Sequence, residues 1–165
     1  MTTLTTEDRY AIRELYARYA WARSTADVEA FVELFTPGAT VRDEGEQFDG
    51  AEGVRTYIDS WVRRRGSAGQ QYWIMQQVLE GDAHSCSVRA FLMTPMLNPI
   101  GTPSMVYYRF GHLADRLVKD GRTWRLAEHV IEQWCGEVLA GFPDFQMVET
   151  ATSPVDRTGP GGGGS

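Results

Sequence analysis

Residues 70–96 read QQYWIMQQVLEGDAHSCSVRAFLMTPM and decide the fold of this chain. They form two long runs of bulky and β-branched residues on either side of the turn signal Gly81–His84, which predicts a β-hairpin. Large side chains occupy both alternating sets of the first run, so we expect this strand to be covered on both faces. Helices from earlier in the chain would cover one face, and a neighbouring subunit or a small molecule would cover the other.

The sequence before the hairpin predicts three helices and one short pair of strands. Apolar residues recur at helical spacing over residues 6–23, 28–35 and 51–65. The second of these helices is expected to end at residues 37–38, because Pro-Gly cannot continue a helix. Residues 40–48 predict two short strands around a polar turn.

After the hairpin, residues 107–118 and 124–134 predict two more long strands. Helices followed by strands predict an α+β domain, with the helices packed on one face of a curved antiparallel sheet. Curling such a sheet around the helices makes a cone with an apolar inside, which suits a small hydrophobic ligand. We expect a single domain over residues 1–147 and a flexible Gly/Pro-rich tail or linker over residues 148–165.

Composition and charge exclude several classes of function. The 165 residues are 42% hydrophobic and 23% charged, as in ordinary globular domains. A net charge of -6 argues against a nucleic-acid partner, and no apolar run approaches the length of a membrane span. Residues 1–9 lack the features of an export signal, so a cytoplasmic location is expected. Cys86 and Cys135 are expected to be buried free thiols, and their spacing predicts no metal site.

Four stretches resemble the SnoaL-like branch of the nuclear transport factor 2-like superfamily. They are YARYAWARSTADVEAFVELFTPGATV at 16–41, GAEG at 50–53, QQVLEGD at 76–82 and ADRLVKDGRTWRLAEHVIEQW at 114–134. The resemblance covers roughly residues 6–134 and implies a cone-shaped α+β barrel with a deep pocket. Enzymes of that superfamily include polyketide cyclases, scytalone dehydratase, ketosteroid isomerase and epoxide hydrolases, mostly without a cofactor. Its other members are binding proteins or subunits of larger assemblies.

Two departures from the family pattern bear on the chemistry. Many SnoaL-like enzymes carry an aspartate at the position of Ser24, where a carboxylate in an apolar cleft acts as a general base. They also tend to carry histidines and an asparagine at the start of the strand that here begins with Tyr72 and Trp73. The resemblance therefore predicts a pocket from which the usual proton-moving groups are missing.

Two polar residues on the later strands, His129 and Asp115, need an interpretation of their own. In one interpretation His129 faces the inside of the cone and moves a proton. In the resembling family, however, the matching strand position usually carries a basic residue on the outer surface, so we favour a surface position for His129. Asp115 matches a common family acid, which we expect to be structural and paired across strands.

Aromatic, methionine and polar side chains remain as the expected pocket lining. Three side chains are expected to position the reacting atoms or to polarise a carbonyl group, and these catalytic candidates are Tyr57, Trp73 and Gln76. The expected substrate-binding residues are Tyr16, Trp21, Ser24, Tyr72, Met75, Met93, Met96 and His129. Neither a metal nor a cofactor is expected.

These expectations favour one function and leave two alternatives. The favoured function is a cofactor-independent cyclase of polyketide-like secondary metabolism, which folds a hydrophobic polyene or macrocycle for ring closure, with a pericyclic cycloaddition as its specific form. The first alternative is an acid/base dehydratase or isomerase of SnoaL or ketosteroid-isomerase type. The second is a non-catalytic small-molecule binding protein or an assembly subunit. A homo-oligomer is expected, because exposed sheet backs in this fold usually pack against a partner subunit.

Overall fold

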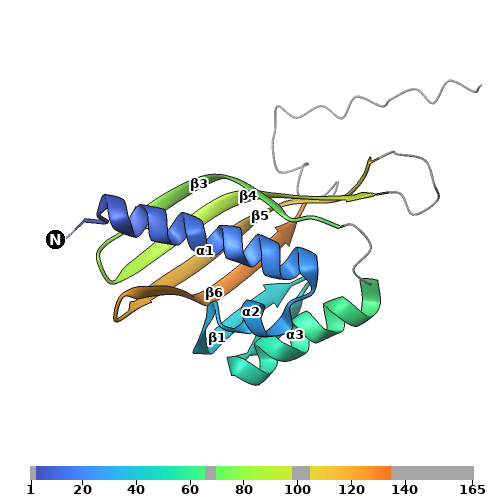
Figure 1. The fold of residues 1–165 in the computed structure, drawn as a ribbon, viewed down its shortest axis with the longest axis horizontal. Coiled ribbons are helices and arrows are strands. Elements are labelled where there is room, and N and C mark those ends of the chain that lie inside the picture. Colours follow the sequence, from blue (N-terminus) through green and yellow to red (C-terminus); the bar gives the residue numbers. More distant parts are fainter. Residues whose placement is uncertain (1–2, 66–69, 98–104, 135–165) are drawn as a thin grey trace, which may run out of the picture. The chain divides into compact units, whose positions relative to one another are not determined.

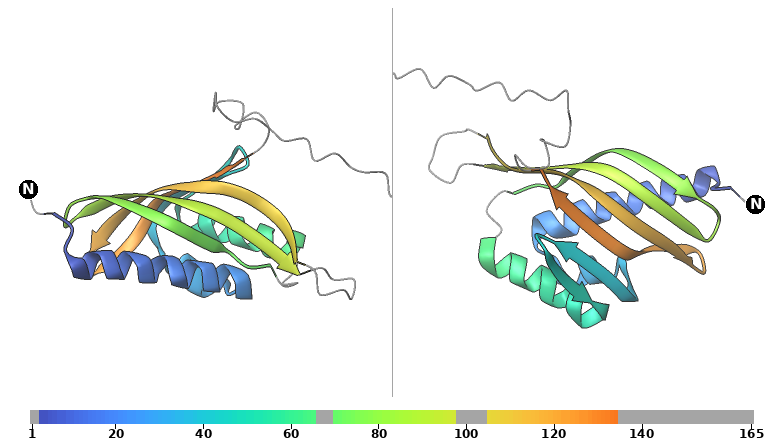
Figure 2. Two further views of the ribbon diagram at one scale, coloured as in Figure 1. Left: turned by 90° about the horizontal axis from the view of Figure 1, so that it is seen from above. Right: turned by 180° about the vertical axis from the view of Figure 1, so that it is seen from behind.

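A computed structural model describes residues 3–65, 70–97 and 105–134 (Figure 1). In chain order the elements are α1 Thr6–Thr25, α2 Val28–Val32, β1 Phe35–Asp43, β2 Glu46–Asp49, α3 Gly50–Arg65, β3 Trp73–Gly81, β4 Ser85–Leu97, β5 Met105–Asp120 and β6 Thr123–Gln133. The predicted α+β domain, with helices on one face of a curved sheet, is confirmed (Figure 2). Within the described ranges no helix combines the length and apolar character that a membrane span requires.

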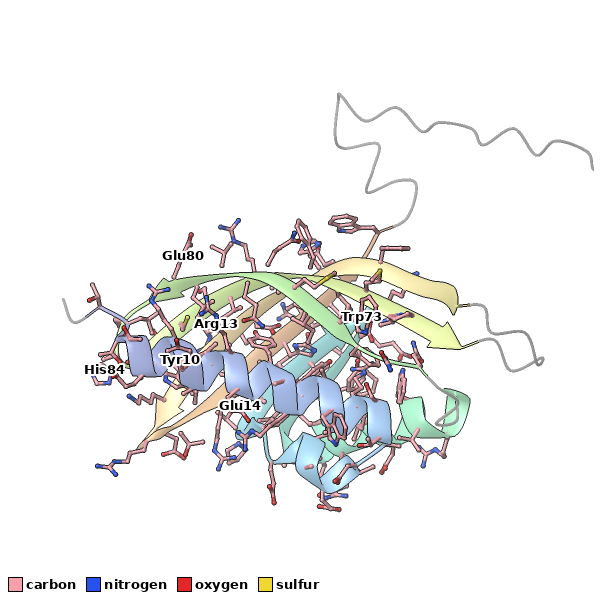
Figure 3. The ribbon with its side chains drawn as sticks, turned by 45° about the horizontal axis from the view of Figure 1, so that its top comes forward. Tyr10, Arg13, Glu14, Trp73, Glu80 and His84 are labelled. Atoms are coloured by element: carbon pink, nitrogen blue, oxygen red, sulfur yellow. The ribbon has the colours of Figure 1, made fainter. Side chains whose placement is uncertain are left out.

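The six strands form one sheet in the order β2-β1-β6-β5-β4-β3. Neighbouring strands are antiparallel except β1 and β6, which run parallel. The predicted hairpin is confirmed as β3 and β4, with the exposed His84 in its turn and Trp73 at the opposite end of β3 (Figure 3). β3 is an edge strand, and its outer face is open in this single chain, because Trp73 and Met75 are 39% and 38% exposed.

The long helix α1 lies along the concave side of the sheet, on the same side as α2 and α3 (Figure 2). It begins at a capping box, in which the side chains of Thr5 and Asp8 each bond the backbone of the other. It ends where Ala26 adopts a left-handed backbone conformation. Its buried residues are Asp8, Ile12, Leu15, Tyr16, Tyr19, Ala22 and Arg23. Four of these seven side chains carry polar groups into the interior.

The second helix is shorter than the sequence predicts. α2 covers Val28–Val32, and the chain enters β1 at Phe35, before the Pro-Gly pair at 37–38. The backbone N–H of Leu126 on β6 donates to the carbonyl oxygen of Leu34 at 2.9 Å, and β1 pairs with β6 from Phe35 onward. Pairing with β6 therefore ends the helix earlier than the proline would.

The two faces of the sheet differ in burial. Side chains on the helix-facing side form the core, whereas Phe91 and Phe110 on the outer face are 45% and 47% exposed. Cys86 is a buried free thiol, as predicted. Cys135 and the predicted tail at residues 148–165 lie outside the described residues.

Candidate active site

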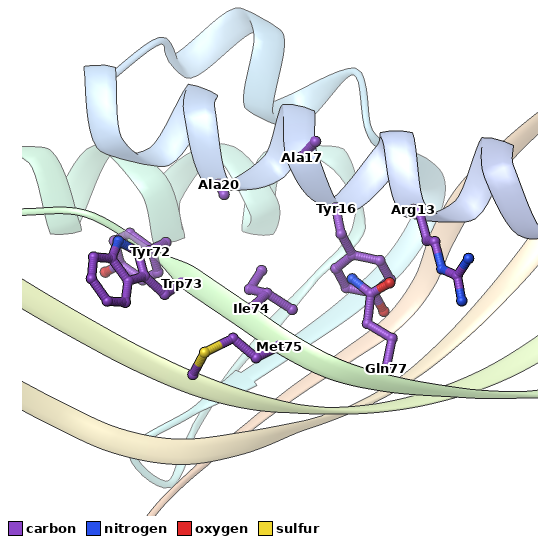
Figure 4. Close-up of a pocket in the computed structure, with 9 residues that line it drawn as sticks. All are labelled: Arg13, Tyr16, Ala17, Ala20, Tyr72, Trp73, Ile74, Met75 and Gln77. Carbon is purple, nitrogen blue, oxygen red and sulfur yellow. The ribbon is translucent and has the colours of Figure 1, made fainter.

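A groove lies between α1 and the edge strand β3 (Figure 4). Its volume is about 450 Å³, and we call it the α1–β3 groove, lined by Arg13, Tyr16, Ala17, Ala20, Tyr72, Trp73, Ile74, Met75 and Gln77. A second hollow of about 430 Å³ adjoins it and shares Tyr72 and Trp73 with it. Together they offer aromatic walls and a few polar groups, which are the features of a small-molecule site.

A β-bulge in β3 decides which side chains face this groove. The register with β4 shifts between Met75 and Val78, and Gln76 between them has a left-handed backbone with a φ of 52°. The extra residue brings Gln77 into the groove and leaves Gln76 exposed. Strict alternation along the strand predicts Gln76 on the same side as Ile74, and the bulge makes that placement wrong.

Tyr16 connects the groove to the core. Its ring borders the groove but is only 1% exposed, and its hydroxyl lies in the core and donates to Oδ2 of Asp115 at 2.5 Å. Asp115 on β5 lies opposite His129 on β6, and Oδ1 of Asp115 is 2.8 Å from Nδ1 of His129. The predicted cross-strand pairing of Asp115 is confirmed. The surface position predicted for His129 is wrong, because its side chain is completely buried.

The hydrogen bonds around His129 determine which ring nitrogen carries the hydrogen. An ionised Asp115 can only accept, so Nδ1 of His129 donates to it. Nε2 lies 2.9 Å from the hydroxyl of Tyr19, and that hydroxyl accepts from Nη1 of Arg23 at 2.9 Å. Tyr19 therefore has its own hydrogen left to donate to Nε2. In the tautomer with its hydrogen on Nδ1, the other ring nitrogen of His129, Nε2, accepts from the buried hydroxyl of Tyr19.

Burial and charge set the acidity of the two hydroxyls that flank this pair. Burial, together with the negative charge of Asp115, raises the pKa of Tyr16 well above its ordinary value of 10. Burial also raises the pKa of Tyr19, and the positive charge of Arg23 offsets part of that increase. Both hydroxyls therefore stay protonated at neutral pH, and each can pass a proton on only in concert with the Asp115–His129 pair.

A second buried cluster continues from Arg23. Its guanidinium also donates to the hydroxyl of Tyr57, which donates in turn to Oδ2 of Asp43 at 2.8 Å. Nη1 of Arg109 lies 3.1 and 3.2 Å from the two carboxylate oxygens of Asp43, and Nη2 of Arg109 pairs with Glu44. Because arginine keeps its proton in proteins, this cluster holds fixed charges.

The structure divides the predicted site residues into those at the groove and those elsewhere. The groove and the adjoining hollow bring together Tyr16, Trp21, Ser24, Tyr72, Trp73 and Met75. Tyr57 and His129 lie in the core, and Gln76 is exposed at the bulge. Met93 is half-buried on the outer face of the sheet, and the side chain of Met96 lies outside the described residues.

The polar core is what sequence reasoning missed. The interior is more polar than expected, since the core holds Tyr19, Arg23, Asp43, Arg109, Asp115 and His129. The sequence did indicate burial for Tyr19 and Arg23. Tyr19 lies three residues after Tyr16, and Arg23 lies four residues after Tyr19, so all three share one face of a helix. Nothing comparable marks the charged residues on the strands, whose burial depends on pairing between distant segments.

Solved structures share this fold. A protein of unknown function with a cystatin-like fold from Nostoc punctiforme is 18% identical, with a TM-score of 0.72, over 82% of this chain and 97% of that chain. A putative scytalone dehydratase from Novosphingobium aromaticivorans is 14% identical, with a TM-score of 0.63, over 78% of this chain and 85% of that chain. ActVI-ORFA from Streptomyces coelicolor is 11% identical, with a TM-score of 0.70, over 78% of this chain and 96% of that chain.

At these identities the solved structures establish the fold and leave the reaction open. Comparison with curated protein sequences gave no significant match. The sequence model of the SnoaL-like domain matches residues 4–130, which include the groove and both buried clusters, and this chain therefore belongs to the SnoaL-like domain family.

Proposed function

We propose that this chain is a cofactor-independent enzyme that moves protons on a hydrophobic carbonyl compound bound in the α1–β3 groove. The reaction would be dehydration, double-bond isomerisation or proton-dependent ring closure of a polyketide-like metabolite. One observation carries the proposal: Tyr16 lines the groove and also donates to Asp115, the partner of His129. The likeness to a putative scytalone dehydratase supports this reaction class at the level of the fold.

Tyr16 is the route by which a bound molecule would reach the buried pair. Tyr16 is only 1% exposed, so the proposed transfer requires the substrate to displace the side chains that cover the Tyr16 hydroxyl. When a substrate proton then moves to the Tyr16 oxygen, Tyr16 passes its own proton to Oδ2 of Asp115, so no phenolate accumulates. His129 keeps its hydrogen bond to the other carboxylate oxygen during this step. The reverse transfer then returns a proton to a second atom of the substrate, such as a leaving hydroxyl. The same relay therefore serves as base and as acid.

Two polar side chains in the groove would assist the relay. Gln77 and Arg13 line the groove together with Tyr16, and both carry N–H donors (Figure 4). Loss of a proton next to a carbonyl leaves negative charge on the carbonyl oxygen, and donors placed near that oxygen stabilise the transition state. Gln77 reaches the groove only because of the bulge at Gln76, so we assign to Gln77 the carbonyl-binding role expected for Gln76.

Ring closure directed by shape alone finds less support. It requires an enclosed apolar chamber, whereas Trp73 and Met75, its expected walls, are each more than a third exposed on β3. It also makes no use of Asp115 and His129, which lie behind the hydroxyl of Tyr16 at the groove. We therefore favour proton transfer as the chemistry of this site.

Exchange of solvent deuterium tests the proposal without knowledge of the natural substrate. The probe is 2-tetralone, a bicyclic aromatic ketone, incubated with the protein in D₂O while NMR follows loss of the protons next to its carbonyl. We expect exchange above the buffer rate, and a decrease of about 100-fold in Tyr16→Phe, the usual contribution of a positioned acid or base. Tyr10→Phe is the matched control, because Tyr10 lies on the same helix but is 68% exposed.

Two outcomes would count against the proposal. If exchange persisted in both Tyr16→Phe and His129→Gln, the relay would be wrong. If 2-tetralone changed the tryptophan fluorescence but exchanged only at the buffer rate, a non-catalytic binding protein would be favoured.

A further inference from the structure

Arg23 has hydrogen-bonding capacity that the described residues do not use. Its side chain is completely buried, and its Nη1 donates to the hydroxyls of Tyr19 and Tyr57. Its Nε and Nη2 have no hydrogen-bond partner within the described part of the chain. Oδ2 of Asp43 lies 3.9 Å from Nη2, which is close enough for an ion pair and too far for a hydrogen bond.

The unused donors lie along one edge of the guanidinium group. Guanidinium carries five N–H groups in a fixed plane, and its Nε–Nη2 edge presents two N–H groups that match the two oxygens of a carboxylate. Donors left unpaired in a dry interior are costly, and buried polar atoms in native proteins nearly always have a partner. The Nε–Nη2 edge of Arg23 therefore carries two unused donors in the arrangement that binds a carboxylate.

The carboxylates of the described residues do not fill this edge. Asp43 is the carboxylate paired with Arg23, yet both of its oxygens lie closer to Arg109, at 3.1 and 3.2 Å. Glu44 pairs with Arg109 as well. Among the residues that the structure describes, no carboxylate thus lies within hydrogen-bonding distance of the Arg23 guanidinium.

A ring of the groove wall lies close to the guanidinium group of Arg23. Five aromatic rings have centroids 4.5 to 5.9 Å from Cζ of Arg23, and the nearest, at 4.5 Å, belongs to Tyr72. The same Tyr72 lines both the α1–β3 groove and the adjoining hollow. Gln70 also lines that hollow, and its Oε1 is buried without a partner among the described residues. Two residues with unused polar atoms therefore neighbour Tyr72, because Arg23 packs against its ring and Gln70 lines the same hollow.

We propose that the Nε–Nη2 edge of Arg23 binds a carboxylate or enolate group of the substrate, admitted from the α1–β3 groove when the Tyr72 side chain moves aside. This inference rests on the proposed function, because it places the substrate in the same groove. It adds the substrate class, which is a hydrophobic acid or a 1,3-dicarbonyl compound. The apolar part of such a molecule stays against Tyr16 and Tyr72, and Oε1 of Gln70 accepts from a hydroxyl next to the anion.

Equilibrium binding of two matched probes tests this inference. 2-Naphthoate and methyl 2-naphthoate share their rings, but only the first carries a negative charge at pH 7. Calorimetry should show at least about tenfold tighter binding of the acid by the wild-type protein, the size of one contact between charged groups. Arg23→Lys keeps a positive charge but lacks the two-pronged edge, so it should lose most of that preference. Arg55→Lys should keep it, because Arg55 pairs with Glu29 at the surface.

A second measurement needs no variant, in case Arg23→Lys does not fold. In wild-type protein labelled with ¹⁵N-arginine, the Nε–H resonance of Arg23 should move downfield on addition of 2-naphthoate and stay in place with the ester. Equal affinity for acid and ester, or an unmoved resonance at saturation, would overturn the inference. So would a folded Arg23→Lys that keeps the preference. Neither readout involves turnover, so the inference can fail while 2-tetralone exchange persists, and the reverse also holds.

Discussion

Asp115 on β5 and Asp43 on β1 are buried acids on the helix-facing side of the same sheet, at 4% and 7% exposure. Each accepts a hydrogen bond from the hydroxyl of a helical tyrosine, Tyr16 at 2.5 Å and Tyr57 at 2.8 Å. In size, burial and tyrosine partner the two sites are close to equivalent. The difference between them lies in the nitrogen groups that they face.

Asp115 faces one histidine, His129, whereas Asp43 faces two arginines, Arg23 and Arg109. An imidazole ring can both donate and accept a hydrogen, while a guanidinium only donates and keeps its charge under all ordinary conditions. The first acid is therefore in a site that can exchange protons, and the second is in a site that can only hold charge. Substitutions of the carboxylates in this chain should reveal that difference in stability, in activity and in pH dependence.

Asp43→Asn should produce the largest loss of stability. It leaves the charges of Arg23 and Arg109 without a buried counter-charge, which costs about 3 to 5 kcal/mol when one member of a buried ion pair is removed. Urea denaturation followed by circular dichroism measures the free energy of unfolding. Asp49→Asn is the control, since Asp49 is an exposed acid on the neighbouring β2, and it should cost less than about 1 kcal/mol. Equal losses in the two variants would show that the arginines do not depend on Asp43.

Asp115→Asn should separate activity from stability. An asparagine of the same shape can still bond Tyr16 and His129, and His129 can remain neutral, so the expected cost is about 1 to 2 kcal/mol. The introduced amide can also donate to Nδ1 of His129, which moves the ring hydrogen to Nε2. In the wild-type protein that Nε2 accepts from the hydroxyl of Tyr19. Exchange of 2-tetralone should then fall about 100-fold.

The same two measurements can contradict this prediction. If Asp115→Asn lost as much stability as Asp43→Asn, Asp115 would be a fixed charge and not a proton carrier. A retained exchange rate in a folded Asp115→Asn would remove the acid from the relay.

Much of the fold was predictable, because its signals are local. The runs around Gly81–His84 contain a complete hairpin, and the helical spacing over residues 6–23 requires only neighbouring residues to be read. The end of α2 was not predictable in this way. The chain leaves that helix because Phe35 pairs with β6, which lies about ninety residues later in the sequence.

The site was less predictable than the fold for a related reason. Alternation along β3 predicts which side Gln76 faces, but one extra residue in the strand reverses that assignment for Gln77. His129 and Asp115 are each ordinary strand residues when read singly, and only the register between β5 and β6 brings them together. Chemistry that arises from contacts across strands leaves little trace in a single sequence.

Asp8 provides a third buried acid, whose partner is a lysine. Lys119 donates to its Oδ1 at 2.7 Å, and this contact is the main reason that the pKa of Asp8 lies well below its ordinary value. A lowered pKa stabilises the folded state above the ordinary value near 4, and the contribution is lost as the pH falls below it. Asp8→Asn should therefore cost about 1 to 2 kcal/mol at pH 7, and the difference from wild type should shrink between pH 5 and pH 2. Asp120→Asn, an exposed acid at the end of β5, should show no such trend in urea titrations.

Glu44→Gln should have the smallest effect, although Glu44 pairs with the same Arg109 as Asp43 does. The side chain of Glu44 is 45% exposed, so water can replace much of the ion pair between its carboxylate and Arg109. The expected cost of Glu44→Gln is therefore below about 1 kcal/mol. Raising the salt concentration from 0.05 to 0.5 M should reduce even that difference, because exposed ion pairs are screened. The cost of Asp43→Asn should hardly change over the same range of salt. If Glu44→Gln instead destabilised the protein as strongly as Asp43→Asn, burial would not be what distinguishes the two acids, and the contrast between Asp43 and Asp115 would need another explanation.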